Sequence, residues 1–408
     1  MKIHTIRESL RAVYWALIDS GLWRRAKNIQ LVWDLLYRFA PYFISTPATL
    51  SEAFPSATKE CVHPPECVQV SDTGERVLTS GAQPFRKKNS YVVPGLSIAK
   101  LENALYCPVN HVVMNSRRDV VNESVREQPE PVLKKLNREA LSQKKVNSLS
   151  GWATTLRTPQ RGYYHTLIDA LPRIEYLARC LETKEEIKLL RPEGGPQIMR
   201  DLEDYFVSKL APPNSYIVDL PPGALYQIEN YILVTCMTRP FSGYLPKHYL
   251  SRFREAVLPE RKPARDRRIY ISRRLTDRRR VRNEEDLLVR LRSMGFESYC
   301  LETLSIEEQI HLFHDAEIVV APHGAGLTNL IFSPPIPVIE LFSTPWIIPH
   351  FYYLAQSLGH NYECLLYPAD VSQNKRDAMR KADLEVDVNE VFDCVHKKLS
   401  FYACKNKI

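Results

Sequence analysis

Apolar and polar residues alternate along the second half of the chain in a way that predicts an α/β domain. Short apolar runs are expected to form buried strands, and stretches with apolar residues at helical spacing separate them. One run, Ile318–Ala321, is apolar throughout, which suits a sheet that is covered on both faces. Over residues 268–342 the alternation is typical of a doubly wound parallel sheet. The predicted strands are Ile269–Ile271, Glu297–Leu301, Ile318–Ala321 and Val338–Leu341.

Helix boundaries in this region carry recognisable end signals. Asn283 is expected to cap a helix that Gly295 ends, and Ser305 with Glu308 has the spacing of a capping box for the next helix. A third, short helix is expected to begin at Leu327.

A weaker α/β pattern precedes this region and is expected to end near residue 240. Apolar positions predict helices over Tyr163–Leu181 and Ile198–Leu210, and short apolar runs near residues 187–190, 216–218 and 232–234 predict strands. We therefore expect an α/β protein with a helical and irregular extension (1–90), a Rossmann-like domain (91–240) and a second Rossmann-like domain with C-terminal helices (241–408).

Residues 1–45 have a basic amphipathic pattern that includes Trp15, Trp23 and Trp33. Such helices usually pack on their own domain. A basic amphipathic segment with tryptophans is also able to lie on an anionic membrane surface. Both interpretations stay open on the sequence alone.

Composition indicates a soluble globular protein, since 44% of the 408 residues are hydrophobic and 25% are charged. Nine cysteines are scattered without a C-x-x-C motif, which favours reduced thiols. There is no apolar run of about 18 residues and no secretory pattern at the N-terminus. We expect a cytoplasmic protein, with peripheral contact at the inner face of the membrane through residues 1–45 as an addition to that expectation.

The net charge of +8 is concentrated in residues 261–282, which contain eleven Arg or Lys and two Asp. Such a segment predicts an anionic partner, either a phosphate group or, as the alternative, a nucleic acid bound by a protein that is not an enzyme. The segment lacks interleaved aromatic residues and any known nucleic-acid-binding module, so we expect no nucleic-acid partner. Arg273 and Arg274 directly follow the first predicted strand, and their planar guanidinium groups suit phosphate oxygens.

A glycine-rich turn follows the third predicted strand. Two of the chain's 14 glycines, Gly324 and Gly326, lie in it. A strand, a glycine turn and a helix start together present backbone N–H groups to an anion, above all a phosphate. The alternative is a tight turn that needs glycine for its geometry alone. The candidate ligand-binding residues of the turn are His323, Gly324, Ala325, Gly326, Thr328 and Asn329.

Polar residues on the first predicted helix are candidates for proton transfer. His165, Asp169 and Arg173 follow one another at intervals of four, which places them on one helix face. His165 or Asp169 is then a possible general base. The alternative is an exposed ion pair between Asp169 and Arg173 beside a packed His165. Pro172 interrupts the helix and makes the alignment of Arg173 uncertain.

Two carboxylates at strand ends complete the set of candidates. Glu340 lies in the fourth predicted strand and Glu302 follows the second, so either is a candidate for sugar or ribose hydroxyl groups, with simple exposure to solvent as the alternative. No Cys, His or carboxylate cluster has metal-ligand spacing, so we expect no metal site.

Several of these motifs, taken in order, resemble glycosyltransferase family 61 (the DUF563 domain). They span roughly residues 160–345, a little under half the chain. They are Tyr163–His165 with Asp169, Leu171, Pro172 and Arg173; Tyr270–Arg274; Arg282–Glu284; Leu301-Glu302 and Leu304-Ser305; Glu308–Ile310; Ala321–Asn329; and Ile339–Leu341.

The resemblance implies a GT-B architecture, in which two Rossmann-like domains face a cleft. It implies an inverting, metal-independent transfer of a sugar from a nucleotide-sugar donor to a glycan or lipid-linked saccharide, without a cofactor. Arg273, Arg274, the turn His323–Asn329, Glu340 and Glu302 become expected donor contacts, and Asp169 or His165 the expected base. Because no secretory signal precedes the domain, the bacterial capsular and lipopolysaccharide enzymes of the family are the expected match.

Overall fold

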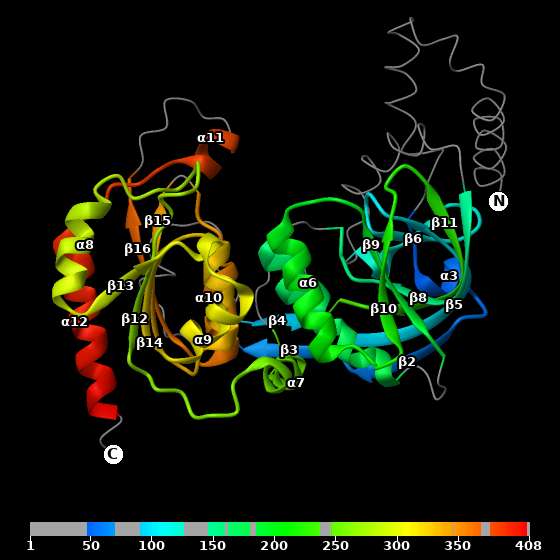
Figure 1. Cartoon of the computed structure of the whole chain (residues 1–408), viewed down its shortest axis with the longest axis horizontal. Coiled ribbons are helices and arrows are strands. Elements are labelled where there is room, and N and C mark those ends of the chain that lie inside the picture. The colour runs from blue at the N-terminus through cyan, green and yellow to red at the C-terminus, as the bar shows by residue number, and fades with distance from the viewer. Residues whose placement is uncertain are drawn as a thin grey trace, which may run out of the picture. The chain divides into compact units, whose positions relative to one another are not determined.

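The computed structural model describes the chain in two compact units (Figure 1). Unit 1 consists of Met1–Pro65, Pro94–Pro196 and Ala211–Pro240, and unit 2 of Glu66–Val93, Gln197–Leu210 and Phe241–Ile408. The residues described are 47–69, 90–125, 146–159, 162–179, 185–236, 245, 247–344, 346–368 and 376–405. The predicted amphipathic segment 1–45 lies outside them.

Unit 1 is built on a mixed sheet of nine strands within the described ranges. The strands follow the order β1-β7-β6-β5-β11-β8-β9-β10, and β2 also pairs with β5. Their bounds are β1 Pro47–Ala48, β2 Thr58–His63, β5 Leu96–Cys107, β6 Val112–Met114, β7 Val120–Val121, β8 Val146–Thr155, β9 Ile187–Pro192, β10 Ser215–Leu220 and β11 Leu225–Val234, with short helices α3 Leu50–Ala53 and η3 Asn122–Val125.

The sheet of unit 1 combines a parallel and an antiparallel part. β11, β8, β9 and β10 run parallel, whereas β5 pairs antiparallel with β11, β6 and β2. The predicted α/β class is therefore present, but the sheet is not the doubly wound parallel one expected for residues 91–240. The long strand β5 carries the polar residues Lys100, Glu102 and Asn103, which interrupt its apolar pattern.

The connection from β8 to the parallel strand β9 contains the first predicted helix in an unexpected form. His165–Ala170 (η4) is a π-helix, and Leu171–Arg179 (η5) is a 3₁₀-helix. Pro172 lacks a backbone N–H, which explains why a regular α-helix does not continue through this point. Short π-helical segments are rare and occur often at functional sites.

Unit 2 contains the parallel sheet that the sequence predicts. Its five strands have the order β13-β12-β14-β15-β16 and pair in parallel throughout. They are β12 Arg267–Ile271, β13 Phe296–Tyr299, β14 Ala316–Pro322, β15 Pro337–Ser343 and β16 Asn361–Tyr367. The first four strands are confirmed, and β16 extends the sheet beyond the predicted region. A separate antiparallel pair, β3 Glu66–Gln69 and β4 Ser90–Val93, is grouped with this unit.

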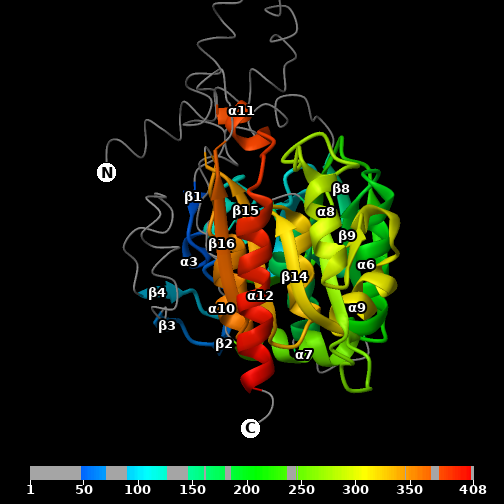
Figure 2. The same cartoon turned by 90° about the vertical axis from the view of Figure 1, so that its left-hand side faces the viewer.

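Helices cover both faces of this sheet, as Figures 1 and 2 show. α8 (Glu284–Ser293) and α12 (Val388–Lys405) lie on one face, and their apolar side chains share a buried cluster with all the strands from β12 to β16. α9 (Ile306–His314), α10 (His350–Leu358) and η7 (Ala325–Phe332) lie on the other. The remaining helices are α6 Gln197–Leu210, α7 Lys247–Val257, η6 Leu301–Thr303 and α11 Arg376–Lys381.

Two of the three predicted helix-end signals are confirmed. The Ser305 hydroxyl accepts the backbone N–H of Glu308 at 3.2 Å, and the Glu308 carboxylate accepts the N–H of Ser305 at 2.7 Å. Gly295 follows α8 with a φ of +79°. The predicted cap at Asn283 is wrong, because its amide is bound instead to the backbone of Val386, at 2.8 and 3.0 Å.

Helix α6 packs within unit 2 although its sequence lies between strands of unit 1. The ring of Phe206 stacks on Phe253 of α7, with centroids 4.9 Å apart, and on Phe332 of η7, at 6.2 Å. The division of the chain into residues 1–90, 91–240 and 241–408 stays a prediction. Within the described part of the chain, no helix is both long and apolar enough to cross a bilayer.

Candidate functional site

The strand order of unit 2 reverses between β12 and β14. The chain leaves β12 toward β13 on one side and reaches β14 on the other. In open parallel sheets, ligands bind at the carboxyl ends of the strands at such a switch point. Arg273 follows β12 and His323 follows β14, so two predicted ligand-binding residues lie at this edge of the sheet.

The glycine turn and Arg273 are in direct contact. A Cβ atom added to Gly324 would overlap the Arg273 guanidinium group, with its Cζ only 3.1 Å away. A Cβ added to Gly326 would lie 2.9 Å from Leu301 Cδ1 and 3.3 Å from Ile271 Cγ2. Gly324 therefore leaves room for the arginine, and Gly326 allows η7 to pack closely on β12.

A second arginine, Arg279, reaches the same edge from the loop after β12. Its backbone has a φ of 55°, and its N–H donates to the carbonyl of Lys381 at 3.1 Å. Leu384 adds two backbone hydrogen bonds to the same loop. The Arg282 N–H donates to the Leu384 carbonyl at 2.8 Å, and the Leu384 N–H donates to the Arg280 carbonyl at 2.9 Å. The loop is thus held against residues 381–384. Arg279 is only partly exposed.

Arg273 and Arg279 form no ion pair with any carboxylate in the part of the chain described. Arg273 Nε donates to the carbonyl of Arg278 at 3.1 Å, and Arg279 Nε is buried without a hydrogen-bond partner. Burial lowers the pKa of both guanidinium groups, and for Arg279 burial, followed by the positive charge of Arg273, lowers the pKa to about 10. Two neighbouring cations without carboxylate partners in the described residues are suited to bind an anion.

A chain of three buried side chains lies beside these arginines. His323 Nδ1 is 2.5 Å from Glu340 Oε1, and Tyr362 donates its hydroxyl to Glu340 Oε2 at 2.5 Å. The His323 ring stacks on Phe342, with centroids 4.8 Å apart. Burial, followed by the charges of Arg279 and Arg273, lowers the pKa of His323 well below its usual value. Burial raises the pKa of Glu340 to about 8, against the opposing effects of Tyr362 and Arg279.

Glu340 was expected to contact hydroxyl groups or to be exposed at a strand end. Its side chain is fully buried, so the exposed alternative is excluded. Glu302 is exposed in η6, and its charge opposes the lowered pKa of Arg273. Glu302 and Glu340 therefore both lie near the carboxyl edge of the unit 2 sheet, where Arg273 lies.

The other predicted residues of the turn have different surroundings. Thr328 is fully buried, and its hydroxyl has no hydrogen-bond partner among the residues that the structure describes. Asn329 donates its amide to Gln309 Oε1 at 2.7 Å and so ties η7 to α9. Ala325 and Arg274 are exposed.

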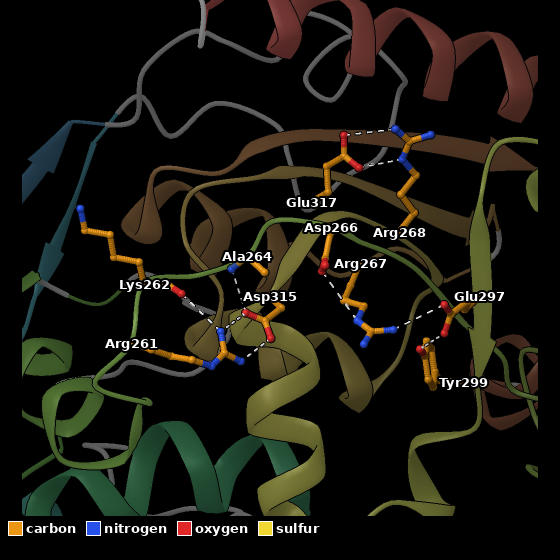
Figure 3. Close-up of polar contacts among 10 residues, drawn as sticks. All are labelled: Arg261, Lys262, Ala264, Asp266, Arg267, Arg268, Glu297, Tyr299, Asp315 and Glu317. Atoms are coloured by element: carbon orange, nitrogen blue, oxygen red, sulfur yellow. Dashed lines mark hydrogen bonds and ion pairs between the residues drawn. The ribbon is translucent and has the colours of Figure 1, made fainter.

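Much of the remaining charge in the basic segment 261–282 is paired with carboxylates (Figure 3). Arg261 binds both oxygens of Asp315, and Arg268 binds Glu317 with a shortest distance of 2.7 Å. Figure 3 also shows Arg267 between Asp266 and Glu297. Arg280 pairs with Asp383 at 3.0 Å. These pairs reduce the positive charge available to a long polyanion, and nothing in the segment supports the nucleic-acid alternative.

In unit 1 the predicted pair of His165 and Asp169 is present. His165 Nδ1 is 2.7 Å from Asp169 Oδ2. The Asp169 side chain is fully buried, whereas 26% of the His165 side chain is exposed. This arrangement fixes the orientation of the imidazole and leaves its Nε2 as the nitrogen that is able to take a proton.

Arg173 does not pair with Asp169. Its guanidinium donates to the carbonyls of Val234 at 2.9 Å, Ala170 at 3.3 Å and Arg157 at 3.4 Å. The expectation that His165, Asp169 and Arg173 share one helix face is wrong, because the segment changes from a π-helix to a 3₁₀-helix between Asp169 and Arg173. Arg173 holds η5 against the end of β11 instead.

Arg279 and Tyr362 are site residues that the sequence did not reveal. Arg279 was one of four basic residues in Arg278–Arg282, and its place depends on contacts about 100 residues away. Tyr362 lies on β16, a strand outside the predicted sheet. Among the described residues, no group of three or more His, Cys, Asp or Glu is placed to hold a metal ion.

Comparison with known families identifies the region that contains both groups of residues. Residues 163–339 match the family model described as Glycosyltransferase 61. The match begins just before His165, includes Arg273 and the turn after β14, and ends next to Glu340.

The curated relatives are plant and animal transferases. The chain is 26% identical over 213 residues to beta-1,2-xylosyltransferase XAX1 of Oryza sativa subsp. japonica, a match that covers 47% of this chain and 37% of the relative. It is 33% identical over 82 residues to EGF domain-specific O-linked N-acetylglucosamine transferase of Gallus gallus, covering 19% and 15%. It is 30% identical over 66 residues to beta-1,2-xylosyltransferase of Arabidopsis thaliana, covering 16% and 12%. The matches thus span little more than a third of each relative's length or less.

These relatives correct the expected location of the protein. The sequence favoured a cytoplasmic protein, at most peripheral at the inner face of a membrane. The relatives are instead eukaryotic, and one is named for EGF domains, which are small secreted modules. The cytoplasmic assignment is therefore wrong. Its main support was that the sequence shows no secretory pattern near residue 1.

Proposed function

We propose that this chain is a glycosyltransferase that takes a sugar from a nucleotide-sugar donor and attaches it to a hydroxyl group of a glycan, because residues 163–339 match the family model described as Glycosyltransferase 61. The observation that carries the proposal is the pair Arg273 and Arg279, which lie without carboxylate partners among the described residues, beside a glycine turn at the switch point of a parallel sheet. The names of the relatives favour a xylosyl or N-acetylglucosaminyl donor.

The donor diphosphate binds at the carboxyl edge of unit 2. Arg273 and Arg279 neutralise its charge, and the backbone N–H groups at the start of η7 with His323 Nε2–H donate hydrogen bonds to its oxygens. As the bond from the sugar to the phosphate breaks, negative charge develops on the leaving oxygen. Donors already in place at that position stabilise the transition state.

His165 is the general base of the proposed reaction. Its Nδ1–H donates to the buried Asp169, so Nε2 accepts the proton of the acceptor hydroxyl. The acceptor oxygen then forms a bond to the anomeric carbon of the sugar, and the nucleoside diphosphate leaves with the electrons of the broken bond. One direct displacement inverts the configuration at that carbon.

The finer features expected from the family belong to the same proposal. They are a GT-B arrangement, which the parallel five-stranded sheet of unit 2 supports, and independence of metal ions, which the paired arginines support by supplying positive charge. Expected contacts of Arg274, Ala325 and Glu302 with the donor are also part of it.

A thermal-shift panel of nucleotides and nucleotide sugars tests the proposal. A ligand at 100 times its Kd should stabilise the full chain by about 2.7 kcal/mol. Nucleoside diphosphates and their sugars should raise the Tm, and the Arg273→Ala/Arg279→Ala double variant should abolish the shift without lowering the Tm of the unliganded protein. If no member of the panel shifts the wild-type protein, the proposed donor site is wrong.

A further inference from the structure

The buried carboxyl group of Glu340 has no contact with solvent, yet both of its oxygens are engaged. Oε2 accepts the hydroxyl of Tyr362 at 2.5 Å, and Oε1 lies 2.5 Å from His323 Nδ1. Three neighbouring parallel strands supply these side chains: His323 directly follows β14, Glu340 is in β15, and Tyr362 is in β16. The hydrogen-bonding state of His323 therefore depends on whether Glu340 carries a proton.

The charged and titratable groups around Glu340 come from every element next to it. Arg279, on the loop after β12, is the positive charge that acts on it, and Arg273 of the same loop acts on His323. On β16 the neighbours are Tyr362 and Cys364, and on α10 Tyr352 faces Tyr362 with ring centroids 5.5 Å apart. Tyr362 and Cys364 have raised pKa values, so both stay neutral near pH 8.

Two hydrogen-bonding states follow from the position of one proton. When Glu340 is protonated, its O–H donates to His323 Nδ1, and the neutral ring carries its own hydrogen on Nε2. When Glu340 is ionised, Nδ1–H donates to the carboxylate, and Nε2 presents a lone pair. Only the first state offers a hydrogen-bond donor to a phosphate oxygen; the second repels it.

We propose that Glu340 is a positioning residue that sets the Nε2–H tautomer of His323 when it is protonated, and that binding of a diphosphate anion to this site is coupled to uptake of a proton by Glu340. This inference rests on the proposed function, because it takes the diphosphate of the donor as the ligand. It adds a coupling between anion binding and proton uptake that neither the family match nor the arginine site requires.

The direction of the coupling follows from charge. The pKa of Glu340 is already raised to about 8 by burial. The positive charge of Arg279 favours the ionised form of Glu340. An anion bound to Arg279 and Arg273 offsets this charge, so the pKa of Glu340 rises further. At pH values just above 8, binding must therefore take up protons, and affinity must fall as the pH rises. Below pH 7 Glu340 is protonated in both states, and the coupling vanishes.

Calorimetric titration of the full chain with UDP, GDP and ADP tests the coupling. These ligands are fully ionised at pH 8.5 and do not take up protons themselves. Comparing two buffers of different ionisation enthalpy at pH 8.5 should show uptake of roughly 0.2–0.8 proton per ligand bound. At pH 6.5 uptake by Glu340 should vanish, and only the partial proton release of the ligand's own terminal phosphate, whose pKa is about 6, should remain. Affinity should fall by up to about tenfold per pH unit between pH 8 and 9.

Two glutamate-to-glutamine variants separate positioning from general structural damage. Glu340→Gln keeps the pattern of the protonated carboxyl, because its amide N–H donates to His323 and its oxygen accepts from Tyr362. This variant should bind as tightly as the wild type at pH 6.5, take up no proton at pH 8.5, and lose the fall in affinity above pH 8. Glu363→Gln, the same change at a partly exposed residue of β16 that pairs with Lys398 at 3.4 Å, should behave as the wild type.

¹⁵N NMR of labelled histidine reads the tautomer without any ligand. His323 should be Nε2–H at pH 7 and shift to Nδ1–H above pH 9 in the wild type, and it should stay Nε2–H at both values in Glu340→Gln. Binding without proton uptake at pH 8.5, or uptake that persists in Glu340→Gln, would overturn the inference and leave the donor site standing. If none of the three nucleotides binds, the proposed function fails and this inference fails with it.

Discussion

At the scale of single residues, the site of unit 2 is defined by charges that the fold leaves uncompensated. Elsewhere in the basic segment, Arg261, Arg268 and Arg280 each have a carboxylate partner. Arg273 and Arg279 have no such partner within the described residues, and burial lowers the pKa of both. A protein that keeps two such cations together at the edge of a sheet loses stability by it, which a bound anion restores.

Removing one of these guanidinium groups should weaken donor binding much more than removing a paired one. A hydrogen bond to a charged group contributes about 1.5–3 kcal/mol, so Arg279→Ala should raise the Kd of a nucleoside diphosphate roughly ten- to hundredfold. Arg267→Ala, which removes an exposed arginine paired with Asp266 and Glu297, should leave the Kd unchanged. Calorimetric titration measures both, and equal effects would argue against a specific role of Arg279.

The raised pKa of Glu340 also predicts how stability depends on pH. Its folded pKa of about 8 exceeds the ordinary value of 4.5, so between these values the folded protein retains a proton that the unfolded chain releases. The contribution of Glu340 to the free energy of unfolding is therefore fully present below pH 4.5. It is lost as the pH rises through 8, at up to about 1 kcal/mol per pH unit. Urea unfolding at pH 7, 7.5 and 8 measures this slope, above the range in which buried His323 and His360 oppose it. A slope that is the same in Glu340→Gln would contradict the assignment.

At the scale of elements, a glycine turn and a π-helix carry the residues of the proposed reaction, and both follow the carboxyl ends of parallel strands. The turn between β14 and η7 was predictable, because two glycines of a glycine-poor chain follow the apolar run Ile318–Ala321 of β14. The His165–Asp169 pair was also predictable from its spacing of four. The π-helical form was not, because it depends on how the segment packs between β8 and β9 rather than on the residues of the segment alone.

Three glycine-to-alanine variants separate the roles of the turn. Gly324→Ala places a methyl group on the Arg273 guanidinium and should weaken donor binding roughly ten- to hundredfold with little loss of stability. Gly326→Ala crowds Leu301 and Ile271 and should lower the free energy of unfolding by about 1–3 kcal/mol. Gly223→Ala meets no atom within 4 Å and should change neither. Thermal unfolding with and without a nucleoside diphosphate distinguishes these outcomes, and the turn would lose its assigned role if Gly324→Ala bound normally.

At the scale of the whole molecule, the sequence predicted unit 2 better than unit 1. Most strands of unit 2 contain a short apolar run, as Ile318–Ala321 does in β14, and its helices carry local end signals such as Ser305 with Glu308. The sheet of unit 1 depends on long strands with polar positions and on antiparallel partners far away in the sequence, and α6, whose sequence lies between its strands, is grouped with unit 2. For the same reason Arg279 and Tyr362 were missed, since pairing with residues 381–384 and the place of β16 bring them to the site.

The central claim is that this chain transfers a sugar with inversion, using His165 as the base. ¹H NMR of the full chain incubated with UDP-xylose or UDP-N-acetylglucosamine tests it without an identified acceptor, because water is able to replace the acceptor hydroxyl slowly. The account predicts that an α-linked donor first releases the β-sugar, at a rate that Asp169→Asn and His165→Ala lower roughly 10²–10⁴-fold without changing the Kd of the donor. Release of the α-sugar, or unchanged turnover by both variants, would contradict it.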